Sequence, residues 1–164
     1  MSERLFNVLF LCTGNSARSI IAEALLRELG GGRFEAFSAG SHPSGEVDAL
    51  ALDMLHRAGC DTTGLRSKSW NEFAAPAAPA LDFIITVCDS AARETCPAFP
   101  GAATRVHWSV ADPSGVDGPL PVRMASFQRT VHALRRRVQH LTGLPFDSVD
   151  RRALGRQLRD IGYL

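Results

Sequence analysis

The chain has 164 residues, a length that fits a single domain, and we expect residues 1–164 to form it. Its formal net charge is +1 and 45% of its residues are hydrophobic, so the totals indicate neither a nucleic acid nor a membrane as a partner. The first apolar run, residues 5–11, is too short for a signal-peptide core with its flanks and far too short to span a bilayer. We therefore expect a cytoplasmic globular protein.

The first part of the chain alternates between apolar runs and helical spacing. The pattern predicts a strand at 5–11, a helix at 19–29 and a second strand at 34–38. A loop at 39–45 and a second helix at 47–55 follow. Three glycines at 30–32 end the first helix, and Gly59 ends the second, because glycine is the usual residue just past a helix end.

The second part of the chain continues this alternation. It predicts a helical turn at 70–73, a connector rich in alanine and proline at 74–80, and strands at 81–87 and 105–110. A long helix is predicted at 124–141, and a last helix runs from a cap at Asp147 or Asp150 to about residue 161. The strand at 81–87 is nearly all apolar, which is typical of a parallel strand covered on both faces. The long helix repeats apolar residues at alternating spacings of three and four, so one of its faces packs on the core.

Strands that alternate with helices indicate an α/β domain. We expect a single open, parallel, four-stranded sheet with helices on both faces. Ligands of such sheets bind beyond the carboxyl ends of the strands. Cys12, Cys88 and the loop after Val110 all follow predicted strands, so we expect them to meet at this edge.

The segment between the first strand and the first helix carries the clearest chemical signal. It reads Leu-Cys-Thr-Gly-Asn-Ser-Ala-Arg-Ser, and its cysteine and arginine bound what we call the oxyanion loop, residues 12–18. Backbone N–H groups of such a loop point inward at a helix start and bind an anion. Arg18 adds a bidentate fork for a tetrahedral oxyanion, and the positive environment favours the thiolate of Cys12. Gly14 and Asn15 tolerate the positive φ angles that an inward-curling loop needs.

A second group of reactive side chains follows the later strands. Cys88 and Cys96 lie on one segment after the third predicted strand, and the sequence lacks the further Cys or His pair that a finger-type zinc site needs. Asp112 follows the fourth predicted strand, where its carboxyl group can protonate a leaving oxygen. An Asp-Pro pair alone indicates only a turn, but with Cys12 at the same edge the catalytic interpretation is favoured. We expect no metal and no cofactor.

Taken together, these residues resemble the low-molecular-weight tyrosine phosphatase superfamily, and more closely its arsenate reductase branch. The motifs that carry the resemblance are residues 12–19, 38–40, 88–97, 107–108, 112–113 and 127–129. They extend over nearly the whole chain. The resemblance implies a thiol-dependent oxidoreductase of arsenical resistance with a redox-active disulfide.

The resemblance also implies how arsenate is bound and attacked. Arsenate, with phosphate or sulfate as analogues, occupies the site formed by Thr13, Gly14, Asn15, Ser16, Ala17 and Arg18. The thiolate of Cys12 attacks arsenic, and Asp112 donates a proton so that hydroxide leaves as water. Ser19 donates a hydrogen bond to the Cys12 sulfur.

A relay of thiols is implied for the later steps. Cys88 attacks the Cys12 sulfur, which releases arsenite and leaves a Cys12–Cys88 disulfide. Cys96 then attacks Cys88 and moves the disulfide outward, so residues 89–96 have to move, and we expect a short helix there to unwind in part. Thioredoxin, or glutathione with glutaredoxin, reduces the final disulfide; the donor stays open.

The chain departs from its relatives at three places. Ser114 stands where the phosphatases carry an aromatic residue, which favours a small oxyanion over an aryl phosphate. Ala17 stands where many relatives carry a second loop cysteine. Some relatives bind a monovalent cation near the loop asparagine; Glu23 and Ser38 match part of that pattern, but an acidic residue near Ser69 is missing, so no cation is expected.

Two other functions are open alternatives. A phosphatase, a hydrolase acting on phosphomonoesters through a phosphocysteine, needs Cys12, Arg18 and Asp112 but gives the later cysteines no role. A non-catalytic redox sensor that binds the oxyanion would leave Asp112 idle.

The remaining reactive side chains favour structural interpretations. Cys60 follows a helix end and is expected to be buried or idle. His107 and Trp108 are expected to fix a loop and fill the core. The arginines at 135–137 and those that follow are expected on solvated helix faces, with docking of an acidic reductase as the alternative.

Overall fold

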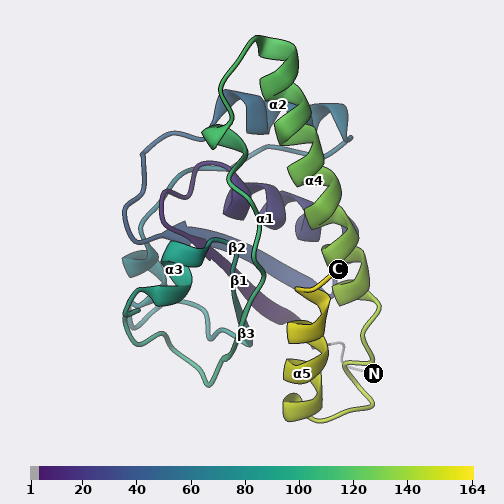
Figure 1. Cartoon of the computed structure of the whole chain (residues 1–164). Helices are drawn as coiled ribbons and strands as arrows, with labels where there is room; N and C mark the ends of the chain where they lie inside the picture. The colour runs from purple at the N-terminus through teal and green to yellow at the C-terminus, as the bar shows by residue number, and fades with distance from the viewer. Residues whose placement is uncertain (1–3) are drawn as a thin grey trace.

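The computed structural model describes residues 4–164. In chain order its elements are β1 (Phe6–Cys12), α1 (Arg18–Leu29), β2 (Phe34–Gly40), α2 (Ala49–Arg57), the 3₁₀ helix η1 (Trp70–Phe73), β3 (Phe83–Thr86), α3 (Asp89–Arg93), β4 (Thr104–His107), the 3₁₀ helix η2 (Pro113–Gly115), α4 (Leu120–Thr142) and α5 (Arg151–Ile161). Their order follows the alternation expected from the sequence (Figure 1).

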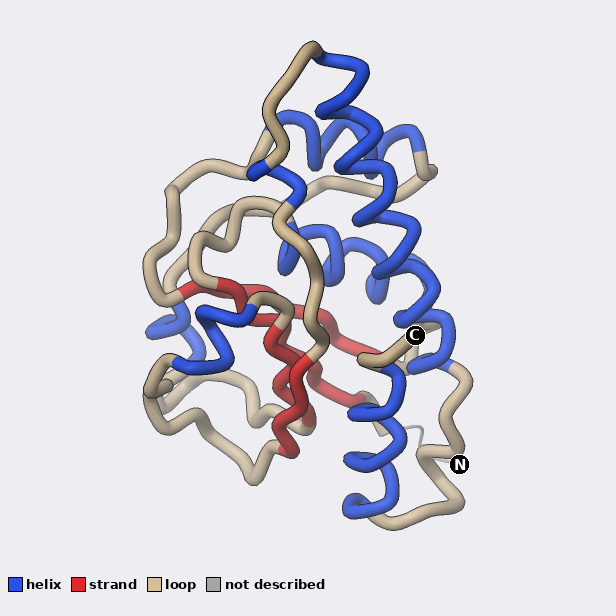
Figure 2. The backbone as a smooth tube through the Cα atoms, viewed as in Figure 1, coloured by secondary structure: helices blue, strands red, loops and turns tan. Residues whose placement is uncertain are grey.

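The four strands form one parallel sheet in the order β2-β1-β3-β4 (Figure 2). β1 lies in its interior, where Leu11 is paired with Ala39 of β2 on one side and with Thr86 of β3 on the other. Because the strands are parallel, their carboxyl ends share one edge, and the loops after β1, β3 and β4 leave from it. The predicted open parallel sheet is confirmed.

The two faces of the sheet are covered by different elements. Alternate residues of a strand point to opposite faces: Val8 and Phe10 join the core formed with α1, α2, α4 and α5, whereas Leu9 and Leu11 join a smaller core with Phe73 of η1. Helices therefore cover both faces, as predicted, with α-helices on one face and η1 on the other. Burial from both sides explains why β1 is apolar at nearly every position.

The later strands are shorter than predicted. β3 spans Phe83–Thr86 within the expected 81–87, and β4 ends at His107 instead of Val110. Trp108 is fully buried outside the strand, and its indole N–H donates to a backbone carbonyl of α5 at 2.9 Å. Packing against α5 thus produces the same apolar signal that a strand would.

The long helix α4 begins earlier than its apolar pattern indicates. Its first residue is Leu120, four positions before Met124, where the predicted helix starts. Leu120 and Val122 are exposed, so the first turn adds nothing to the buried face. Within residues 4–164 no helix, this one included, combines the length and apolar character needed to cross a membrane.

Gly40, at the end of β2, allows the oxyanion loop to approach the sheet. A Cβ atom there would lie 2.8 Å from the carbonyl oxygen of Cys12 and closer still to that of Thr13. Gly40→Ala is therefore expected to lower the free energy of unfolding by about 1–3 kcal/mol, as overpacking does. Urea unfolding measures the change, with Gly143→Ala as the matched control because a Cβ there makes only ordinary contacts. Equal stabilities of the two variants would contradict this explanation.

Candidate active site

The oxyanion loop leaves β1 at Cys12 and enters α1 at Arg18. Cys12 is 4% exposed, and its Sγ atom accepts a hydrogen bond from the backbone N–H of Asn15 at 3.2 Å. The Oγ atom of Ser19, in the first turn of α1, lies 2.8 Å from the same sulfur. The loop thus curls back over Cys12, with hydrogen-bonding groups facing the sulfur.

Asn15 holds the loop in this shape. It is fully buried and has a φ of 45°, in the left-handed region that asparagine tolerates better than most residues. Its Oδ1 accepts from the backbone N–H of Lys68 at 2.8 Å, and its Nδ2 donates to Ser19 at 2.8 Å and to Ser38 at 3.0 Å. The expected positive φ falls on Asn15, whereas Gly14 does not have one.

The hydrogen bonds of this network run in one direction. Ser38 donates its hydrogen to the carboxylate of Glu23, so its oxygen accepts from Asn15. Asn15 places its two amide hydrogens on Ser38 and Ser19. Ser19 is therefore an acceptor toward Asn15, which leaves its own hydroxyl hydrogen free for the sulfur of Cys12, 2.8 Å away. The hydroxyl of Ser19 and the backbone N–H of Asn15 thus both face the sulfur of Cys12.

A buried charge cluster lies at the far end of the network. The Nζ atom of Lys68 lies 3.7 Å from Oε1 of Glu23 and 3.4 Å from Oγ of Ser38, and it donates to the carbonyl of Arg66 at 3.0 Å. Lys68 is 8% exposed, and burial lowers the pKa of its ammonium group. Glu23 is 3% exposed and also pairs with Arg27. The cluster is thus closed to solvent while its charges offset one another.

Lys68 was not predicted from the sequence. Two signals were available in the sequence. Lys68 directly precedes Ser69, near which an acidic residue is missing, and it is the chain's only lysine. Its ammonium group lies within reach of Glu23 and Ser38, the two residues that match the cation-binding pattern of some relatives. A side chain of the protein thus supplies positive charge at this position.

Asp112 meets the oxyanion loop at Arg18. The guanidinium group of Arg18 donates to the carbonyl of Val110 at 3.0 Å and lies 3.8 Å from Oδ2 of Asp112. The Oδ1 atom of Asp112 accepts from the backbone N–H and the hydroxyl of Ser114, at 3.0 and 2.7 Å. Ser114 thus orients the carboxyl group at the position where an aromatic side chain is expected in the phosphatases.

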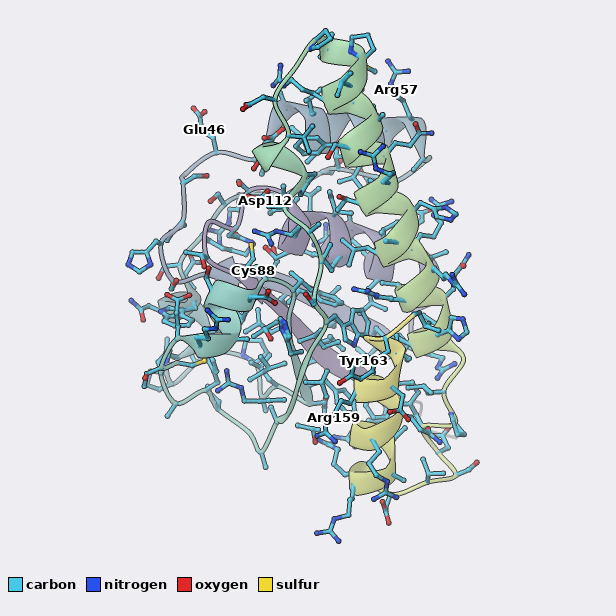
Figure 3. All side chains as sticks on the ribbon, viewed as in Figure 1. Glu46, Arg57, Cys88, Asp112, Arg159 and Tyr163 are labelled. Carbon is cyan, nitrogen blue, oxygen red and sulfur yellow. The ribbon has the colours of Figure 1, made fainter. Side chains whose placement is uncertain are left out.

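Cys88 lies against the oxyanion loop. It is 2% exposed, and its Sγ atom accepts from the backbone N–H groups of Thr13 at 3.3 Å and Ala91 at 3.4 Å. Thr13 directly follows Cys12, so Cys88 touches the residue next to the first thiol. Figure 3 labels Cys88 and Asp112, which lie on the segments after β3 and β4.

Cys96 lies apart from Cys88. Cys88 packs with the core under the α-helices, whereas Cys96 packs against the smaller core on the opposite face of the sheet. All four cysteines are free thiols, and the sulfur of Cys96 accepts from the guanidinium group of Arg105 at 2.6 Å. A disulfide needs about 5.5–6 Å between Cα atoms, so a bond between Cys88 and Cys96 calls for movement of the intervening residues. These residues include the short helix α3, whose presence was predicted.

His107 and Trp108 have the structural roles that were predicted. His107 joins β4 to α3, with ring nitrogens 2.8 Å from Asp89 and 2.7 Å from the hydroxyl of Thr86. The hydrogen bond from His107, followed by that from Ser109, lowers the pKa of the Asp89 carboxyl group. This contact ties down the first turn of α3, next to Cys88.

Two further predictions concern side chains outside the site. Cys60 is buried, as predicted, and burial raises the pKa of its thiol. The prediction that the arginines at 135–137 lie on a solvated face is wrong for Arg137, which is 8% exposed. Its guanidinium group donates to the carbonyls of Ser109 and Leu164, so it packs α4 against the chain after β4.

The profile of the low molecular weight phosphotyrosine protein phosphatase family matches residues 7–157. The chain is 32% identical over 132 residues to an arsenate reductase of Halalkalibacterium halodurans, and the aligned region covers 80% of this chain and 91% of that protein. It is similar to the crystal structure of an arsenate reductase from Archaeoglobus fulgidus DSM 4304, with a TM-score of 0.63, 27% identity and coverage of 84% and 99% of the two chains. It is also similar to the structure of a low molecular weight protein tyrosine phosphatase from T. tengcongensis, with a TM-score of 0.61 and 28% identity; the match covers 79% of this chain and 92% of that one.

The buried ammonium of Lys68 predicts a pH-dependent stability. Burial lowers its pKa below the ordinary 10.5, so the unfolded chain binds this proton more tightly and the stability contribution rises with pH up to 10.5. The free energy of unfolding in urea, wild type minus Lys68→Met, is expected to grow from neutral pH toward 10.5. Since the chain has one lysine, NMR of ¹³Cε-labelled lysine follows its titration directly. A titration midpoint at or above 10.5 would overturn the prediction.

Proposed function

The chain belongs to the low molecular weight phosphotyrosine protein phosphatase family, and we propose that it is an arsenate reductase whose residues 1–164 act as one domain. The observation that carries the proposal is the contact between Cys88 and Thr13, with 3.3 Å from the sulfur to the backbone nitrogen. A phosphatase has no use for a second thiol beside the oxyanion loop. A reductase needs one, because arsenic gains two electrons only if two sulfur atoms lose them.

Arsenate, with phosphate or sulfate as analogues, binds in the oxyanion loop. The residues proposed to hold it are Thr13, Gly14, Asn15, Ser16, Ala17 and Arg18. The loop opens onto the N-terminus of the 12-residue helix α1, whose dipole favours an anion and whose first turn carries no acidic residue. Nη1 of Arg18 donates to the carbonyl of Val110, but the 3.8 Å from Nη2 to Asp112 is too long for a bidentate pair, so Asp112 does not occupy the guanidinium fork.

The first chemical step forms a sulfur–arsenic bond. The Cys12 thiolate attacks arsenic, and Asp112 donates a proton so that one arsenate oxygen leaves as water. Ser19 accepts from Asn15 and lies 2.8 Å from the Cys12 sulfur, and its role in the proposal is to donate a hydrogen bond to that sulfur. The two hydrogen bonds from Ser114 hold the Asp112 carboxyl group beside the loop.

The second step transfers two electrons to arsenic. The Cys88 thiolate attacks the Cys12 sulfur, the sulfur–arsenic bond breaks toward arsenic, and arsenite leaves with a Cys12–Cys88 disulfide behind it. The backbone N–H groups of Thr13 and Ala91 hold the Cys88 sulfur beside the oxyanion loop for this attack. Cys96 then attacks Cys88, and thioredoxin, or glutathione with glutaredoxin, reduces the Cys88–Cys96 disulfide.

The second candidate is a phosphatase acting through a phosphocysteine. The similarity to the T. tengcongensis phosphatase favours it, and a weak activity of this kind is expected because Cys12, Arg18 and Asp112 suit both reactions. Ser114 in place of an aromatic residue argues against aryl phosphates as the main substrates. A redox sensor without catalysis is less well supported, since it gives Asp112 no role.

Single-turnover reduction tests the relay. Fully reduced protein is mixed with arsenate without any external thiol, and arsenite released and thiols lost are counted. Wild type is expected to release about one arsenite and lose two thiols per chain, because the disulfide supplies two electrons. Cys12→Ser and Cys88→Ser abolish the release, whereas Cys96→Ser retains it. Cys60→Ser serves as the matched control, since that thiol lies outside the proposed relay.

Other outcomes separate the candidate functions. Phosphate released from an aryl phosphate by Cys12, with no arsenite from any variant, would establish the phosphatase. Arsenite that forms only after glutathione is added would keep arsenate reduction but replace Cys88 by the small thiol. If the protein binds arsenate but yields neither arsenite nor phosphate, the non-catalytic redox sensor would be the function supported.

A further inference from the structure

Lys68 is a buried charged residue to which the proposed reaction gives no step. It is 8% exposed, and lysine is almost never buried in a protein unless its ammonium group is paired. Buried ion pairs add little to stability compared with apolar side chains of the same volume, because both charges lose their water. The ammonium group of Lys68 therefore calls for an explanation other than the stability of the fold.

Three oxygen atoms face the nitrogen of this ammonium group. They are Oε1 of Glu23 at 3.7 Å, Oγ of Ser38 at 3.4 Å and the backbone carbonyl oxygen of Arg66 at 3.0 Å. An ammonium group has three hydrogens and accepts none, so these oxygens match its donors in number. Oxygen atoms of these kinds are also the ligands of hard metal cations, and here they face a cation that the chain itself carries.

Lys68 fixes the side-chain amide of Asn15 from both ends. Its backbone N–H donates to Oδ1 of Asn15 at 2.8 Å, which sets the orientation of the amide because a backbone N–H can only donate. Nδ2 of Asn15 donates to the hydroxyl of Ser38 at 3.0 Å, and the ammonium group donates to the same hydroxyl. With two donors directed at its oxygen, Ser38 places its own hydrogen on Glu23, so each hydrogen-bonding position of this hydroxyl is used.

Glu23 has two cations beside it, but only one of them is buried next to this network. Arg27 contacts Oε2 of Glu23, and its side chain is 41% exposed. Lys68 faces Oε1, the oxygen that accepts from Ser38. Water screens an exposed charge far more than a buried one. Loss of the ammonium group therefore leaves a buried negative charge at Oε1, on the side of Glu23 that holds Ser38.

Asn15 needs this support because it holds the oxyanion loop in a strained conformation. Its φ of 45° lies in the left-handed region, where a residue other than glycine persists only if its surroundings hold it there. The amide of Asn15 is held by Lys68, Ser38 and Ser19. Two of these three contacts involve Lys68, either directly or through Ser38, so the ammonium group bears on the shape of the loop.

We propose that Lys68 is a positioning residue of the oxyanion loop. Its ammonium group serves as a cation built into the chain, which holds Glu23 and Ser38 in place and, through Ser38, fixes the amide of Asn15. The loop that Asn15 shapes binds the oxyanion, so Lys68 acts on binding without touching the ligand. The inference rests on the oxyanion site of the proposed function, which the reductase and the phosphatase share, and not on the thiol relay.

Binding of inorganic phosphate tests this role without any redox step. Calorimetry gives the dissociation constant in a buffer whose only cation is tetramethylammonium, which has no N–H group. The buffer contains about 0.3 M chloride, so that long-range charge effects are screened. Wild type is compared with Lys68→Ala, which opens the space of the side chain, and with Lys68→Met, which fills it. Arg27→Ala is the matched control, because it removes the other cation beside Glu23.

Both substitutions of Lys68 are expected to weaken phosphate binding roughly tenfold, because a buried carboxylate loses its partner. Arg27→Ala is expected to stay within about twofold of wild type, since a partly exposed ion pair contributes little. Propylammonium supplies the atoms that Lys68→Ala lacks, so it is expected to restore binding in that variant and not in Lys68→Met. Potassium is expected to leave the wild-type constant unchanged.

An NMR signature separates positioning from a general loss of stability. The side-chain amide signals of Asn15 in ¹H–¹⁵N spectra are expected to shift in both Lys68 variants. In Lys68→Ala they are expected to return toward their wild-type positions with propylammonium. Circular dichroism shows which variants are folded, and Lys68→Met carries the test if Lys68→Ala does not fold.

Four results would overturn the proposal. One is phosphate binding by folded Lys68→Met that equals that of wild type. The second is a loss in Arg27→Ala as large as in the Lys68 variants, which would make positive charge sufficient wherever it lies. The third is folded Lys68→Ala that propylammonium does not restore. The fourth is a wild-type constant that tightens with potassium, because a free cation would then take the place given to the ammonium group.

Failure of the proposed reductase is a separate result. It is seen as a lack of arsenite in single turnover, while the phosphate constants of wild type and the Lys68 variants remain measurable.

Discussion

The side-chain amide of Asn15 is the constraint on which the rest of the site depends. It is fully buried, holds the oxyanion loop in a left-handed turn, and bonds at once to α1, β2 and the backbone of Lys68. Because Asn15 donates one amide hydrogen to Ser38 and the other to Ser19, the hydroxyl hydrogen of Ser19 is left free for the Cys12 sulfur, 2.8 Å away. One amide thus couples the shape of the anion-binding loop to the surroundings of its nucleophile, and the buried Lys68–Glu23 cluster lies next to Ser38 at the other end of the network.

The thiols are arranged from the interior toward the surface. Cys12 lies under the loop, Cys88 touches the neighbouring Thr13, and Cys96 lies near solvent on the opposite face of the sheet beside Arg105. Parallel strands bring the first two together at one edge, whereas the third packs against the core on the other face of the sheet. This order suits a relay in which electrons enter at the surface and arsenic receives them inside.

Local features of the site were predictable from the sequence, and non-local ones were not. The strand, loop and helix around Cys12 follow from adjacent residues, and parallel topology is enough to place Cys88 and Asp112 at the same edge. The burial of Lys68 depends on Glu23, far away in the sequence, and the position of Lys68 before Ser69 does not by itself reveal this contact. Strand β4 was predicted too long and Arg137 too exposed for a related reason, since packing between helices and the chain after β4 buries residues that the sequence pattern cannot place.

The central claim, that Cys12 and Cys88 form a disulfide as arsenite leaves, is tested most directly by peptide mapping. One equivalent of arsenate is added to reduced Cys96→Ser protein, and the linked peptides are identified by mass spectrometry without a reductant. The expected result is a peptide containing Cys12 joined to a peptide containing Cys88, with Cys60 still a free thiol. Cys12 found as a free thiol, or joined to Cys60, would contradict it.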